Sequence, residues 1–177
     1  YKWRANGTEA DLLEEGGEEV LTIGSDTFDY LYPSRAQCNL CHTPVAGPVL
    51  GFRTRQLNRD LAYPGCGTAN QIESLSVAGF INPSLTTEDL ADVLTSSPKN
   101  AAGVSDEDWV RSYMDSNCSH CHQPGGSSRA FFDARLSTPL ANQSIVCGPV
   151  IDGLGAPSPA VAKPGSYENS VMLLRMN

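Results

Sequence analysis

The sequence predicts a mainly α-helical protein with extensive loops and a small N-terminal β unit. Three observations favour this fold class. The 177 residues include 16 glycines and 12 prolines but only 18% charged side chains, which is typical of a globular chain rich in loops. Apolar and polar residues alternate near the N-terminus, as in strands, and the clearest helical periodicity starts at Ser105.

The N-terminal β unit is predicted from three short segments that are separated by turns. The segments are YKWR at 1–4, EADLL at 9–13 and EEVLTI at 18–23, with ANGT and a Gly-Gly pair between them. We expect them to form a small antiparallel unit. From residue 30 to 66 the pattern is irregular, and YPSRAQ, PVAGPVLG and AYPGCG indicate loops, so secondary structure alone is not expected to order this stretch.

Helices are predicted after this irregular stretch. Two weak candidates lie at 71–80 and 85–94, and Thr86 or Thr87 is expected to cap the second. The segment SSPKNAAG at 96–103 is rich in Pro, Gly and Ser, so we interpret it as a connector between two halves.

The helix after the connector is the best defined in the chain. Ser105 is the expected N-cap, acidic residues fill the first turn, and an apolar stripe follows at helical spacing. A short amphipathic helix, capped by Ser166, is expected at the end of the sequence. The predicted division is therefore a segment 1–103 with the β unit and a segment 104–177 with this helix.

The charge balance disfavours a nucleic-acid partner. The formal net charge is -8 and the sequence pI is about 4.7, whereas phosphate binding needs clustered Lys and Arg. Much of the acid lies in residues 9–19, which we interpret as a solvated turn between strands. No run of about 18 apolar residues occurs, so we expect a soluble chain with no transmembrane segment.

Two pentapeptides of the form Cys-x-x-Cys-His suggest the chemistry of the protein. CNLCH and CSHCH contain four of the six cysteines and all three histidines, two of which occupy the final position of the motif. Covalent haem attachment requires this spacing, because two thiols add to the vinyl groups on one haem edge and the adjacent imidazole becomes the proximal iron ligand. The sequence therefore predicts two covalently bound haem c groups. The first haem is assigned to Cys38 and Cys41 for attachment and His42 for ligation. The second is assigned to Cys118 and Cys121 for attachment and His122 for ligation.

Two other uses of these cysteines are weighed against haem attachment. Two Cys-x-x-Cys pairs can supply four thiolates to zinc, but the gap of about 75 residues between them exceeds the 15 to 20 of a typical zinc ribbon. A thioredoxin-like redox pair is the other alternative, and no βαβ pattern surrounds either motif. Both stay open as minor alternatives.

The expected cellular location determines whether the two remaining cysteines, Cys66 and Cys147, pair with each other. Haem is attached covalently on the oxidising side of a membrane, so we expect a periplasmic or extracellular bacterial protein, where spare thiols normally pair. The sequence therefore predicts a disulfide between Cys66 and Cys147, which would tie the two halves together. In the chain-entropy model a loop of this length contributes about 4 to 5 kcal/mol. Two free buried cysteines are the alternative.

The distal haem ligands must come from a short inventory. His120 lies between the cysteines of its own motif, so it is either the distal ligand of the first haem or a hydrogen-bonding imidazole. Met172 and Met176 lie four residues apart on one face, where packing is the default, and Met176 is the candidate distal ligand of the second haem. Met114 is expected to pack in the core, on the same helical face as Cys118.

Four longer segments carry a family pattern. They are YPSRAQCNLCHTPVAGPVLGFRTRQLN, the helix ending NCSHCHQPGG, the phrase ARLSTPLANQSIVCG, and the closing KPGSYENSVMLLRM. Together they resemble the C-terminal cytochrome c portion of secreted bacterial proteins, where it often follows a quinoprotein sugar dehydrogenase-like propeller. The resemblance covers residues 30–177 and implies a cytochrome c-like second half with haem attached at both motifs. The propeller is absent, so no dehydrogenase activity is implied, and no Met-Pro-Pro segment supplies the usual distal methionine.

These observations predict a di-haem c-type cytochrome that transfers electrons outside the cytoplasm and is not an enzyme. Its partners would be redox donor and acceptor proteins, and haem-to-haem stacking between subunits would build a homo-oligomer or a filament. The alternative is a di-haem peroxidase with one five-coordinate haem, which the shortage of distal ligands favours and the lack of an acid/base pair disfavours. A structural zinc module is the third possibility.

Overall fold

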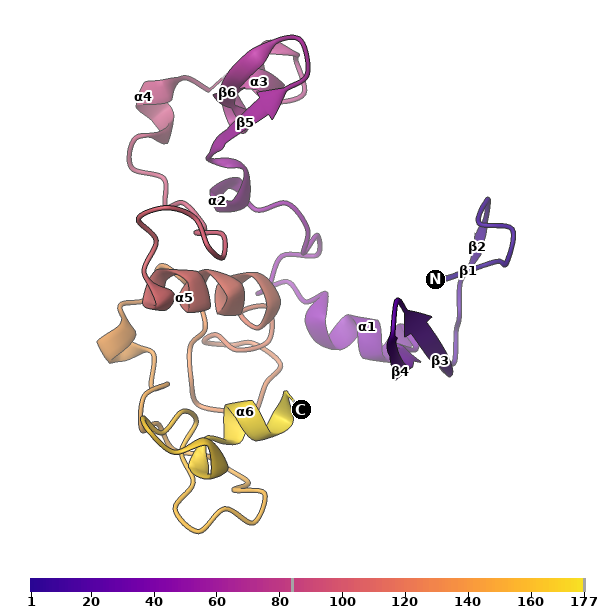
Figure 1. The fold of residues 1–177 in the computed structure, drawn as a ribbon, viewed down its shortest axis with the longest axis vertical. Helices are drawn as coiled ribbons and strands as arrows, with labels where there is room; N and C mark the ends of the chain where they lie inside the picture. Colours follow the sequence, from indigo (N-terminus) through magenta and orange to yellow (C-terminus); the bar gives the residue numbers. More distant parts are fainter. Residues whose placement is uncertain (84, 177) are drawn as a thin grey trace.

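The computed structural model describes residues 1–83 and 85–176. Figure 1 shows an open molecule with three parts: an arm (residues 1–34), a lobe (58–95) and a body (105–176). The accessible surface is 12034 Å², whereas a compact monomer of this mass exposes roughly 8,300 Å². The protein alone therefore leaves much more surface exposed than its size requires.

Two antiparallel hairpins make up the arm. Strand β1 (Lys2–Trp3) pairs with β2 (Ala10–Asp11), and β3 (Gly17–Ile23) pairs with β4 (Asp26–Tyr32). A two-residue turn joins β3 to β4, and Gly24 in it has φ 64°, which suits a tight hairpin. The three predicted segments do form strands, but not as one unit: β1 and β2 make one sheet, and β3 pairs in a separate sheet with β4, a strand that the sequence analysis missed.

A short helix carries the first Cys-x-x-Cys-His motif, in contrast to the predicted irregular stretch. Helix α1 (Arg35–Cys41) begins after Ser34, whose side chain caps the Gln37 N–H while the Gln37 side chain accepts from the Ser34 N–H. This capping box compensates for the absence of any buried residue in α1. The prediction that secondary structure would not order this segment is wrong.

The lobe contains a third hairpin and two helices. Strands β5 (Asp60–Tyr63) and β6 (Gly67–Asn70) pair antiparallel, and α3 (Gln71–Val77) follows directly, capped by the Asn70 side chain. Helix α4 (Thr87–Leu90) is a single turn that Thr86 caps. Both predicted helices are present in shorter form, and the hairpin lies where loops were predicted.

The body is organised around the longest helix. Helix α5 (Asp106–Asn117) begins at the predicted N-cap Ser105, whose side chain accepts from the Asp108 N–H. The final helix α6 (Val171–Arg175) begins after Ser170. Ser166, the predicted cap, instead precedes a separate single turn of 3₁₀ helix at Tyr167–Asn169.

A small core holds the body together. Met114, Ala134, Ile145 and Val161 form its buried centre. Partly buried side chains pack around this centre: Cys118, Phe132, Val150, Ala162 and Met172. The packing role predicted for Met114 is confirmed, and the second motif begins at the edge of this core.

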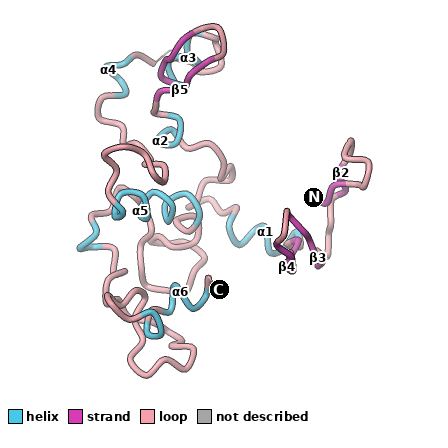
Figure 2. The backbone as a smooth tube through the Cα atoms, viewed as in Figure 1, coloured by secondary structure: helices cyan, strands magenta, loops and turns pink. Residues whose placement is uncertain are grey.

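The predicted fold class is wrong, because the chain is not mainly α. About 25% of the residues are helical and 17% lie in strands of small separate sheets. Figure 2 shows that loops make up most of the body and join the short elements elsewhere. Buried polar side chains order several of these loops, as where Gln143 donates from its side chain to the Arg135 carbonyl. Such long-range polar contacts leave no periodic signal in a sequence.

The connector at 96–103 lies against α5, where the Ser97 N–H donates to the Ser112 hydroxyl. Short helix α2 (Thr54–Leu57) also contacts α5, through the Gln56 side chain and Ser116. The division at residue 103 stays an interpretation, since side-chain contacts cross it. Within the described part of the chain, none of the helices combines the length and the apolar character that a bilayer span requires.

Candidate functional site

The first motif projects from the last turn of α1. Cys38 and Cys41 lie three positions apart, and His42 is the C-cap residue that follows. The His42 Nδ1 lies 2.7 Å from the Pro48 carbonyl oxygen. A carbonyl only accepts, so Nδ1 carries the proton and Nε2 keeps a free lone pair. Iron-ligating histidines are oriented by this kind of bond to the backbone, so His42 has the form of a proximal ligand.

The second motif lies in the turns that extend α5. Cys118 is the C-cap of α5, and the His122 N–H donates to the Cys118 carbonyl at 2.9 Å. The His122 ring is half-buried and stacks on Phe132, with ring centroids 4.0 Å apart. Burial lowers the pKa of His122, and its buried Nδ1 has no hydrogen-bond partner. His122 is therefore a neutral imidazole at neutral pH, and its Nδ1 lacks the kind of backbone partner that orients His42.

A cavity of about 560 Å³ opens beside His122. Cys118 and His122 line one side, and Met172 and Met176 from α6 line it as well. The remaining lining is largely apolar, with Phe132, Val150, Ile151 and Val161, and Arg129 and Arg175 add two cations. The volume and the apolar lining are those of a cofactor pocket. The structure thus brings Met176 to the cavity that His122 lines, as the predicted ligand pair requires.

The two motifs meet through one sulfur each. Cys41 Sγ lies 3.2 Å from Cys121 Sγ, although the two residues are 80 positions apart. The hydrogen bond to Cys121, followed by burial, raises the pKa of Cys41 to about 11. Burial also raises the pKa of Cys118. The thiols of Cys41 and Cys118 are therefore protonated at neutral pH. One cysteine of each motif is in contact with one of the other.

His120 occupies a different environment from the one its ligand role needs. Its Nδ1 accepts from Arg53 Nη2 at 2.7 Å, and its Nε2 donates to the Ser116 carbonyl at 3.0 Å. Burial and the neighbouring Arg53 lower the pKa of His120, and His42 lies near enough to contribute to the shift. Both ring nitrogens are engaged, so ligation of the first haem stays a prediction that requires these two bonds to break.

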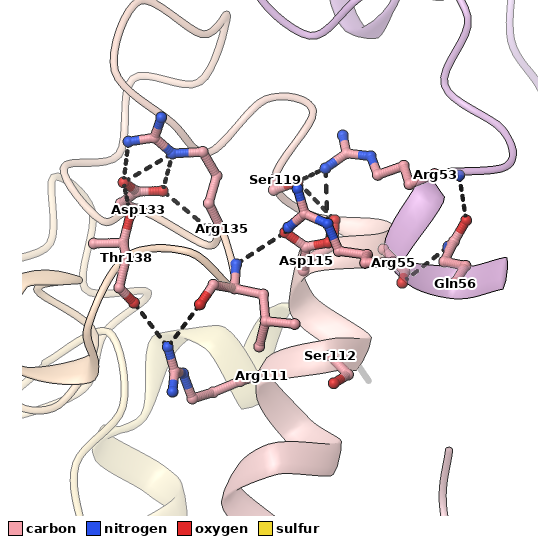
Figure 3. A network of polar contacts seen from close by, with 12 residues as sticks. Arg53, Arg55, Gln56, Arg111, Ser112, Asp115, Ser119, Asp133, Arg135 and Thr138 are labelled. Carbon is pink, nitrogen blue, oxygen red and sulfur yellow. Dashed lines mark hydrogen bonds and ion pairs between the residues drawn. The ribbon is translucent and has the colours of Figure 1, made fainter. Parts of the chain in front are cut away.

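A buried ion network fixes the second motif to the segment after the first. Asp115 is fully buried in α5, and Arg55 Nη1 lies 2.7 Å from its Oδ1 (Figure 3). Arg53 lies 3.7 Å from the other carboxylate oxygen and also donates to the Ser119 hydroxyl at 2.9 Å. The sequence analysis missed this network. Its only signal is the run FRTR, which places two arginines in a chain that has few cations.

The predicted disulfide is not formed. Cys66 and Cys147 are both free and exposed, which also excludes the alternative of two buried cysteines. Cys66 lies in the turn of the β5–β6 hairpin, and this hairpin projects away from the body that contains Cys147 (Figure 1). The separation of lobe and body therefore keeps the two thiols unpaired.

The described residues contain no group of three or more His, Cys, Asp or Glu side chains that could hold a metal ion. The four motif cysteines therefore do not converge as a tetrahedral zinc site would need. Cys41 and Cys121 meet, while Cys118 faces the cavity beside His122.

Comparison with protein-family models, curated proteins and solved structures found no match for this chain. The resemblance to cytochrome c portions of secreted bacterial proteins therefore stays a prediction. The chemistry of the site has to be inferred from its own residues and their contacts.

Proposed function

We propose that this protein is a di-haem c-type cytochrome that carries electrons between redox proteins outside the cytoplasm and is not an enzyme. The repeated Cys-x-x-Cys-His motif is the observation that carries the proposal, because the first copy forms the last turn and C-cap of α1 and the second copy begins at the C-cap of α5. In each motif two thiols and one imidazole lie within one or two turns of the chain, as attachment to one haem edge requires.

The residues around the second motif fit a haem. Cys118 and Cys121 would hold it covalently, and His122 and Met176 are the two candidate axial ligands. Neutral His122 and the apolar cavity both favour an iron porphyrin, and the guanidinium group of Arg129 suits one of its carboxylates. Arg175 lies 3.9 Å from Asp152, which also lines the cavity, so a second haem carboxylate would compete with Asp152 for it. When bound, haem c supplies an iron that cycles between two oxidation states at a potential set by ligands and burial.

The small core of the protein also supports the proposal. Eight apolar residues are classed as buried in the described part of the chain, and the same number of polar residues is buried with them. Two haems would add large apolar faces to this core and cover part of the excess surface. Haem burial would then replace packing that the polypeptide does not supply.

The first site is more open than the second. Cys38 and His42 are exposed, and α1 has no buried residue. A haem edge held there would be accessible to a donor protein, an acceptor protein or a second copy of the chain. Apolar side chains of the adjacent arm, among them Val20, Ile23 and Leu31, are also exposed. These features support a homo-oligomer or filament in which the first haem of one subunit faces its neighbour.

The di-haem peroxidase remains the alternative function. The structure favours it at one point, since both nitrogens of His120 are engaged and the first haem then lacks a sixth ligand. Absorption spectra of the oxidised and reduced protein separate the two functions. Two low-spin haems support the carrier, whereas a high-spin haem that reacts with hydrogen peroxide supports the enzyme.

Haem stoichiometry in paired variants tests the proposal. The protein is secreted from a host that attaches haem c, and haem is quantified per polypeptide after denaturation. We expect two haems in the unchanged protein and in the Cys66→Ser/Cys147→Ser control, and one haem in Cys38→Ala/Cys41→Ala and in Cys118→Ala/Cys121→Ala. Equal haem content in all four proteins would contradict attachment at the motifs.

A further inference from the structure

The contact between Cys41 and Cys121 places two thiols close enough to form a disulfide before haem is attached. The two sulfurs are 3.2 Å apart, and each belongs to a different motif. A disulfide bond requires an S–S distance of about 2.05 Å, so a small movement of either side chain joins them. The thiols are therefore placed to react with each other.

Pairing within the first motif is less favourable. Cys38 and Cys41 are both inside α1, three positions apart. Helical residues at this spacing have Cβ atoms about 5–6 Å apart, whereas a disulfide spans about 3.5–4.5 Å between Cβ atoms. A bond between them would distort the end of the helix, so the contact across the motifs is favoured.

Side chains alone hold this contact in place. Arg53, which follows the first motif in the sequence, donates to Ser119 and His120, the two residues between Cys118 and Cys121. Arg55 pairs with buried Asp115 just before the second motif. No haem is needed for these bonds, so the haem-free chain already presents one cysteine of each motif to the other.

We propose that Cys41 and Cys121 form a disulfide in the newly secreted, haem-free chain, and that its reduction is required before either haem is fully attached. Both S–H bonds break and one S–S bond forms. The two electrons and two protons pass to the disulfide of a thiol oxidase protein, which becomes a dithiol. A reducing dithiol protein reverses the reaction by thiol–disulfide exchange.

The bond has two consequences for assembly. It keeps one thiol of each motif from adding to a vinyl group, so neither motif can complete both thioether bonds while the bridge exists. It also ties the end of α1 to the turns that follow α5. The disulfide itself is independent of the proposed function, whereas its role in haem attachment rests on it.

Disulfide mapping of the haem-free protein tests the proposal. The chain is secreted from a host that lacks haem attachment, its thiols are blocked with N-ethylmaleimide, and it is digested without reductant. The Cys66→Ser/Cys147→Ser variant removes the two exposed thiols that could interfere. We expect a linked peptide pair that contains Cys41 and Cys121. Links within a motif, or maleimide on both cysteines, would overturn the proposal.

Matched variants and a second host complete the test. Cys38→Ser should keep the linked pair, and Cys121→Ser should abolish it. Attachment is then followed in vitro with the oxidised and the reduced haem-free protein, and we expect it to be lost in the oxidised form. Equal attachment in both forms would overturn the assembly role. A linked pair in a protein that never takes up haem in a competent host would instead contradict the proposed function and leave the disulfide intact.

Discussion

The histidines that end the two motifs differ in how they are held. His42 is exposed and oriented by the Pro48 carbonyl, whereas His122 is half-buried against Phe132 with an unpartnered Nδ1. The sequence predicted the same role for both from the motif alone. It did not predict this difference, because burial and hydrogen bonding depend on segments far away in the chain.

Met176 is the side chain whose role can be tested most simply. Met176→Ala should lower the reduction potential of the second haem, on the order of 0.1 V, because a methionine ligand raises the potential of haem iron. Met172→Ala is the matched control, since Met172 lines the same cavity but packs against the core. Potentiometric titration of both variants checks this. A shift in the Met172 variant alone would assign the ligand to Met172.

The buried histidines make the haem-free protein sensitive to mild acid. The folded-state pKa values of His122 and His120 are lowered from 6.5, mainly by burial. The unfolded chain therefore binds more protons below pH 6.5, and the free energy of unfolding falls as pH drops from 6.5 through the folded pKa values. Urea unfolding at a series of pH values measures this. His122→Gln should flatten the pH dependence, and an unchanged slope would contradict it.

Helix α5 connects the core, the ion network and the second motif. Its capping residue and its apolar stripe were recognisable in the sequence, so this helix was predicted closely. Helix α1 was missed because it has seven residues and no buried face, and its only signal is the capping box of Ser34 and Gln37. The hairpin of β5 and β6 was missed as well, since its turn residues were interpreted as loop.

The network around Asp115 should contribute strongly to stability. Asp115→Ala leaves Arg53 and Arg55 without their buried partner, so we expect a loss of about 3 kcal/mol in the free energy of unfolding. Glu107→Gln is the control on the same helix, since the Glu107 side chain is exposed and its 3.6 Å ion pair with Arg111 is worth less than about 1 kcal/mol. Chemical denaturation compares the two. Similar losses would contradict a dominant role for the network.

The whole molecule is open and acidic. The two Cys-x-x-Cys-His motifs were recognisable in the sequence. The sequence did not predict the cavity, the contact of Cys41 with Cys121, or the unpaired state of Cys66 and Cys147. These features depend on how arm, lobe and body are arranged. The accessible surface of 12034 Å² exceeds that of a compact monomer of this mass, so arm, lobe and body share few buried contacts.

The net charge of -8 should govern the choice of redox partner. Electron transfer to a basic redox protein should be fast at low salt and slow down as ionic strength rises, because salt screens the attraction. An acidic redox protein is the control, and its rate should rise with salt. Stopped-flow measurements from 10 mM to 1 M salt check this, a range over which the screening length falls from about 30 Å to about 3 Å. Equal salt dependence for both partners would contradict electrostatic steering.

Covalent attachment of two haems is the central claim, and the intact mass of the secreted protein under denaturing conditions tests it most directly. The account predicts the polypeptide mass plus two haem groups that survive denaturation and extraction with acidified acetone. A colourless protein with the mass of its amino acids alone would contradict it.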